Sequence, residues 1–75
     1  MSNYAPALRA YLSLGVTHAD LAAKISKTQA SVTRYASGDR FPDADTARQI
    51  DEATSGAVPF ALWQADFMAR SGIAA

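Results

Sequence analysis

One face of an expected helix near the middle of the chain offers an amide, a methyl group, a hydroxyl and a guanidinium. The residues on this face are Gln29, Ala30, Thr33 and Arg34. Amide and guanidinium groups can each pair with a purine edge in the major groove of DNA, while hydroxyl and methyl groups can contact other base edges or the thymine methyl. We therefore expect this face to read bases in double-stranded DNA, and the alternative is an ordinary solvated helix surface.

A second group of side chains around this face could hold the phosphate backbone. It consists of His18, Lys27, Thr28, Ser31 and Arg40. Cationic side chains neutralise phosphates, an imidazole nitrogen can donate a hydrogen bond to a phosphate oxygen, and capped helix starts direct backbone N–H groups outward. Ser31 could instead face the core or the backbone. For Lys27, Thr28 and Arg40 the alternative is plain surface charge, with side chains that contact water and no phosphate.

The elements that must position these side chains are helices. Apolar residues recur at helical spacing along the chain, and no segment shows the sustained alternation of a strand. The pattern predicts a compact all-α fold of five helices in a single domain over residues 1–75, with residues 70–75 as a frayed tail. The first helix is expected from Pro6 to Leu14, followed by Gly15 as its stop.

Two of these helices are expected to form a helix-turn-helix at about residues 17–37. Thr17 and Thr28 are natural N-cap residues, and Gly38 is a natural C-terminal stop. The turn between the two helices is expected to be very tight. The seam between the helices is predicted to bury Leu21, Ala22, Ile25, Val32, Tyr35 and Ala36.

The second half of the chain should add two helices. Asp43 is expected to cap a fourth helix that buries Ala47 and Ile50, and Val58-Pro59 should lead into a final helix. That helix carries large aromatic side chains at helical spacing: Phe60, Trp63 and Phe67. They could simply close the core, but in so small a domain we expect this stripe to be shared with a second subunit in a homodimer.

Charge and composition limit the function classes. The net charge is zero, yet residues 1–42 hold five Lys or Arg against two Asp or Glu, while residues 43–75 hold two against five. A basic end can still dock onto phosphates. The chain has no Cys, one His and no long apolar run. We therefore expect no metal site, no cofactor, no enzymatic centre and no membrane segment. The expected location is cytoplasmic and nucleoid-associated.

The segment from residue 17 to residue 42 resembles the Cro and lambda-repressor-like family, the xenobiotic-response-element type of helix-turn-helix that includes small Cro-like and YdaS-like prophage regulators. The matching residues are Thr17, Ala19, Asp20, Leu21, Ala22, Ile25, Gln29, Val32, Arg34, Tyr35, Gly38, Arg40, Phe41 and Pro42. Three positions depart from the family pattern: Ser26 stands where Gly is usual, Lys27 where an aliphatic residue is usual, and His18 where Gln is frequent. The resemblance implies that Ser26 adopts the positive φ for which Gly is usual there.

The resemblance implies a lambda-repressor-like fold and a sequence-specific transcriptional regulator. The expected function is a repressor that binds a pseudo-palindromic operator as a homodimer, because a module of this size makes few contacts with a single half-site. The alternative is a protein-binding role, either as the antitoxin of a toxin pair or as an adaptor whose acidic and aromatic C-terminal half grips a partner protein.

Overall fold

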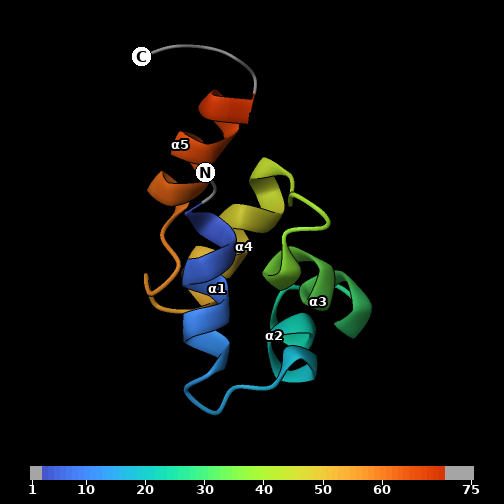
Figure 1. The fold of residues 1–75 in the computed structure, drawn as a ribbon. Coiled ribbons are helices and arrows are strands. Elements are labelled where there is room, and N and C mark those ends of the chain that lie inside the picture. Colours follow the sequence, from blue (N-terminus) through green and yellow to red (C-terminus); the bar gives the residue numbers. More distant parts are fainter. Residues whose placement is uncertain (1–2, 71–75) are drawn as a thin grey trace.

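The computed structural model describes residues 3–70, and this part of the chain is all-α (Figure 1). Its five helices are α1 (Tyr4–Leu12), α2 (His18–Lys24), α3 (Gln29–Ser37), α4 (Ala44–Ala53) and α5 (Phe60–Arg70). The predicted five-helix, all-α fold is therefore confirmed. Arg70, expected in a frayed tail, is the last residue of α5, and the rest of that predicted tail lies outside the described residues. None of these helices is long and apolar enough to cross a membrane.

The core lies where all five helices meet. α3 packs against α1 and α2, α4 contacts α2, and α5 packs against α1 and α4. The largest side chains that are completely enclosed are Tyr4, Leu8, Leu21, Ile25, Ile50, Val32 and Val58. The seam predicted between the second and third helices is buried as expected, which fixes the rotation of α3 about its own axis.

The turn between α2 and α3 satisfies the backbone at the end of α2. Ile25 is the C-cap, Ser26 has φ 57°, and the Lys27 N–H donates to the Ala22 carbonyl at 2.9 Å. This bond spans six residues and is that of a Schellman motif, which normally places glycine at the position of Ser26. The positive φ expected at Ser26 is confirmed, and it costs on the order of 1 kcal/mol for a residue with a Cβ.

The first helix begins earlier than predicted, at Tyr4 rather than Pro6, and ends at Leu12 rather than Leu14. The early start has a long-range cause, because the buried Asp66 carboxylate on α5 accepts hydrogen bonds from the backbone N–H groups of Asn3 and Tyr4 at 2.9–3.1 Å. Pro6 then lies in the first turn, where its missing N–H leaves no helical bond broken. The early end fits the 78% exposure of Leu14, since another helical turn would bury no apolar surface there.

The hydroxyl of Tyr4, the first residue of α1, has an unusual environment. It is buried and makes no hydrogen bond with any of residues 3–70. Its burial raises the pKa of the Tyr4 phenol, and the nearby negative charge of Asp51 and the neighbouring Tyr35 raise it further. The phenol therefore stays protonated, and Tyr4 contributes to the core as an apolar ring rather than as a titrating group.

The fourth helix begins at the predicted N-cap, Asp43. The Asp43 carboxylate accepts a hydrogen bond from the Thr46 N–H at 2.8 Å. At the other end Ser55 and Gly56 both have positive φ, and the Gly56 N–H donates to the Asp51 carbonyl at 2.9 Å. The Asp51 carboxylate in turn accepts from the Phe60 N–H at 2.9 Å, so one residue of α4 also fixes the start of α5.

Replacing Val32 by aspartate should unfold the domain. The Val32 side chain is completely buried between α2 and α3, and an unpartnered charge there costs several kcal/mol, on the order of 3–5. Ala30→Asp is the matched control, because Ala30 is exposed in the first turn of the same helix, where a negative charge is favourable. Thermal melts followed by circular dichroism measure both, and a cooperative, wild-type-like melt for Val32→Asp would contradict this packing.

Stability should fall in acid in a manner that depends on Asp43. Hydrogen bonds from the Thr46 side chain and backbone lower the pKa of Asp43 from its usual value, and the positive charge of Lys27 adds to this. A lowered folded-state pKa means that the stabilisation is complete above about pH 4 and is lost as the pH falls through the folded-state value.

Asp43→Asn keeps an N-cap that does not titrate, so its stability should vary less with pH below about 4 than that of the wild type. Asp43→Ala should lose about 1 kcal/mol at neutral pH. Urea titrations at several pH values test both, and identical pH profiles for the wild type and Asp43→Asn would refute the assignment.

Candidate nucleic-acid interface

The exposed face of α3 carries the four residues predicted to read bases. Gln29, Ala30, Thr33 and Arg34 are all exposed. The opposite face of the helix buries Val32, Tyr35 and Ala36. This packing fixes the rotation of α3 about its axis, so the face that carries the four residues must point to solvent. The sequence prediction of helix phase is confirmed, and the four side chains form one continuous strip.

The structure brings His18 and Thr33 together, although they were predicted to have separate roles. His18 is the first residue of α2, and its Nδ1 lies 2.7 Å from the Thr33 Oγ1 in the second turn of α3. The Thr17 hydroxyl caps the same end of α2 by accepting from the Asp20 N–H at 3.0 Å. The N-terminus of α2 is thus fixed to the exposed face of α3 by a side-chain hydrogen bond.

Thr28 and Ser31 also interact with each other. The Thr28 Oγ1 accepts from the Ser31 N–H at 3.1 Å and donates to the Ser31 Oγ at 3.0 Å. Thr28 is therefore the N-cap of α3, as predicted, and its hydroxyl hydrogen is committed to Ser31. The Ser31 hydroxyl is half-buried, and its own hydrogen can still be donated to another acceptor.

The two predicted cationic contacts flank α3 at its two ends. Lys27 is exposed in the turn before α3, and Arg40 is exposed in the loop after it. The loop is held to the helix by the Arg40 N–H, which donates to the Arg34 carbonyl at 3.3 Å. A positive side chain therefore lies beyond each end of the four-residue strip.

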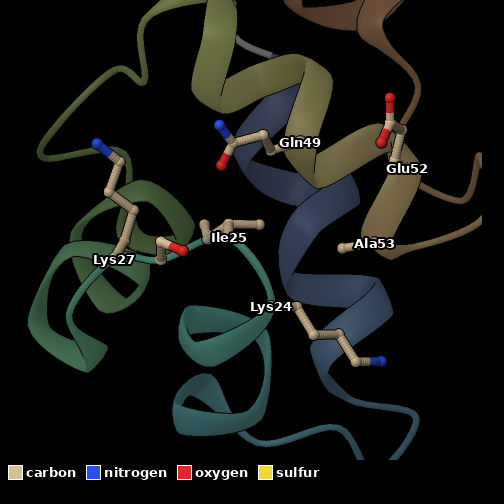
Figure 2. Close-up of a pocket in the computed structure, with 7 residues that line it drawn as sticks. Lys24, Ile25, Lys27, Gln49, Glu52 and Ala53 are labelled. Carbon is tan, nitrogen blue, oxygen red and sulfur yellow. The ribbon is translucent and has the colours of Figure 1, made fainter.

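An open groove of about 610 Å³ separates the turn after α2 from α4 (Figure 2). Its lining consists of Lys24, Ile25, Ser26, Lys27, Gln49, Glu52 and Ala53. Lys24 and Lys27 lie on the side of α2 and the turn after it, and Gln49 and Glu52 lie on α4, so the lining has mixed charge (Figure 2). Only Lys27 among the predicted site residues lines it, and the groove is therefore separate from the exposed strip on α3.

A contact from α1 that could not be predicted from the sequence supports α3 on the side away from the exposed strip. The Arg9 Nη1 on α1 donates to the Ala36 carbonyl at 2.6 Å, near the C-terminus of α3. A cation at this end of a helix interacts favourably with its dipole and satisfies a carbonyl of the last turn. No local pattern around Arg9 could have revealed this partner, which lies 27 residues away in sequence.

The aromatic stripe on α5 lies away from the strip on α3 (Figure 1). The Trp63 ring stacks on Phe41, Phe60 and Phe67 with ring centroids 5.0–5.5 Å apart, and its Nε1 donates to the Pro42 carbonyl at 2.7 Å. Trp63 is only 7% exposed, so this residue of the stripe already closes the core of a single chain, and its part in a contact between two subunits stays a prediction. The unpredicted partner is the Phe41-Pro42 loop, which folds over the indole.

The rest of the stripe is partly open to solvent. Phe67 is 45% exposed and its neighbour Met68 is 39% exposed, while Phe60 is half-buried beneath the Arg48 guanidinium, 4.9 Å from the ring centroid. Arg70 lies in the same way over Phe41, at 4.5 Å. The surface that α5 could offer to another molecule is therefore centred on Phe67 and Met68 rather than on Trp63.

Comparisons with known proteins return no matching family model, curated protein or solved structure. Among residues 3–70, no cluster of three or more His, Asp or Glu side chains is suited to hold a metal ion.

Replacing Trp63 by alanine should destabilise the isolated chain by about 3–5 kcal/mol, because it removes a buried indole, three ring contacts and the hydrogen bond to Pro42. Phe67→Ala is the control within the same stripe and should cost less, about 1–2 kcal/mol, since Phe67 is 45% exposed. Equilibrium unfolding at low protein concentration separates the two. Similar losses for both variants would show that the indole is not the centre of this cluster.

Proposed function

We propose that this chain is a sequence-specific double-stranded DNA-binding regulator, most simply a transcriptional repressor, that inserts α3 into the major groove. The observation that carries the proposal is the exposed strip of Gln29, Ala30, Thr33 and Arg34 on a helix whose opposite face is locked into the core. A reading helix needs this combination, because base recognition requires polar groups held at fixed positions.

The surroundings of the strip fit contacts with the phosphate backbone. Lys27 and Arg40 lie beyond the two ends of α3, and the N-termini of α2 and α3 are capped by Thr17 and Thr28. Capped helix starts and exposed cations are the groups that bind phosphates and fix the register of a protein on the duplex. The basic excess of residues 1–42 lies in the same half of the chain, so the acidic half can face away from DNA.

We also propose that two copies bind together, one at each half of a pseudo-palindromic operator. A single reading helix with a few phosphate contacts gives modest affinity at cellular salt, and joining two sites raises it. The exposed Phe67 and Met68 on α5 supply apolar surface for a two-fold contact away from α3. The reading helices would then lie about 34 Å apart, one turn of DNA.

The same exposed pair favours a second candidate function, in which α5 binds a different protein. An antitoxin or an adaptor would use Phe67 and Met68 as its apolar contact, set in the acidic half of the chain. This role is compatible with DNA binding through α3, because the two surfaces are on different helices.

Arg34→Ala should abolish specific binding while leaving the fold intact. The Arg34 side chain is exposed on α3, and the loss of one good base contact costs about 1–3 kcal/mol per subunit. Arg48→Ala is the matched control, because it removes an exposed arginine from α4, outside the proposed interface. The measurement is selection of sequences from a random duplex library, followed by binding titrations and footprinting on the selected duplex.

We expect the wild type and Arg48→Ala to select the same two-fold symmetric sequence and to protect two half-sites. If Arg34→Ala keeps wild-type affinity and an unchanged salt dependence, Arg34 does not read bases. If the wild type enriches no sequence at all, the proposed function itself is wrong.

A further inference from the structure

The hydrogen bond between His18 and Thr33 joins a residue proposed to touch phosphate to a residue proposed to read a base. Nδ1 of the half-buried His18 lies 2.7 Å from the Thr33 Oγ1, and within residues 3–70 the other ring nitrogen, Nε2, makes no hydrogen bond. The Thr33 hydroxyl in turn has no second side-chain partner among these residues. Which atom supplies the hydrogen of this bond depends on the tautomer of the imidazole.

A neutral imidazole carries a single N–H, and this decides the direction of the bond. If Nε2–H donates to a phosphate oxygen, Nδ1 has only a lone pair and must accept. The hydrogen in the bond to Nδ1 must then come from the Thr33 hydroxyl. With that hydrogen committed to His18, the Thr33 Oγ1 presents only lone pairs to a base.

We infer that His18 is a positioning residue that makes Thr33 an obligate hydrogen-bond acceptor on the reading face. Thr33 would then select base edges that donate, namely the amino groups of adenine N6 or cytosine N4, and would disfavour guanine O6 and thymine O4. This inference rests on the proposed function and deepens it, because it predicts which class of base α3 accepts at one position of the operator.

The neighbourhood of the pair supports this arrangement. His18 and Thr33 line a largely apolar hollow of about 420 Å³ together with Arg9, Leu12, Ser13, Ala36 and Ser37. The guanidinium of Arg9 is the one Lys or Arg group in this lining, and its Nη1 donates to the Ala36 carbonyl at 2.6 Å. The side-chain partner of the Thr33 hydroxyl among residues 3–70 is Nδ1 of His18.

The test compares the sequences selected from a random duplex library by the wild type and by three variants. Thr33→Val removes the hydroxyl and should erase base preference at one operator position, which identifies the base that Thr33 touches. At that position the wild type should favour adenine or cytosine over the other bases by at least about fivefold. His18→Ala frees the hydroxyl to rotate and donate, so the preference should fall to about twofold or less.

His18→Asp separates positioning from phosphate binding. A carboxylate is an acceptor only, so it should keep the Thr33 hydroxyl oriented and retain the base preference. The same charge repels phosphates, so affinity for every sequence should fall, by about tenfold or more. If His18 had a merely structural role, His18→Asp would not lower the affinity for DNA while keeping the base preference. Thermal melts check that each variant folds.

A measurement on the complex with the selected duplex tests the tautomer directly. The ¹⁵N chemical shifts of the His18 ring in this complex at pH 8 should show hydrogen on Nε2 and a lone pair on Nδ1. The opposite tautomer would overturn the inference, as would a selected guanine or thymine at the Thr33 position, or a preference that His18→Ala leaves unchanged. Each of these results would leave the proposed function standing, whereas failure of the wild type to select any sequence would remove that function.

Discussion

The tight connection from α2 to α3 is the constraint on which the rest of the structure depends. With Ser26 in the left-handed region and the Lys27 N–H bonded back to Ala22, the chain reverses within a few residues. Ile25 and Val32 can then both be completely buried on the two sides of the turn. The strain at Ser26, on the order of 1 kcal/mol, is small beside the burial of these side chains.

Because this seam fixes one face of α3, the opposite face can be mostly polar without loosening the fold. Two side chains from other helices hold α3 further along its length, with Arg9 at the Ala36 carbonyl and His18 at the Thr33 hydroxyl. The helix is short, so apolar packing alone would leave its last turn weakly held. These two polar contacts therefore add to the apolar packing that holds α3 in place.

Local signals predicted much of this molecule, because caps and stops are encoded within a few residues. The N-caps Thr17, Thr28 and Asp43 accept the hydrogen bonds expected of them, and Gly38 is left-handed at the end of α3. Periodicity then fixed the exposed face of α3. What could not be predicted depends on partners distant in sequence, because neither the capping of α1 by Asp66 nor the covering of Trp63 by the Phe41-Pro42 loop leaves a local pattern.

The bond from Asp66 to the start of α1 has a consequence for the order of folding. Asp66 is separated from Asn3 by 63 positions in the sequence and from Tyr4 by 62 positions. Almost the whole chain must therefore be in place before these hydrogen bonds can form. The contacts between α2 and α3, in contrast, close a short loop at small entropic cost and can nucleate early. The α2–α3 pair should therefore belong to the folding nucleus, while the docking of α5 onto α1 comes late and is the first contact to be lost when the chain opens.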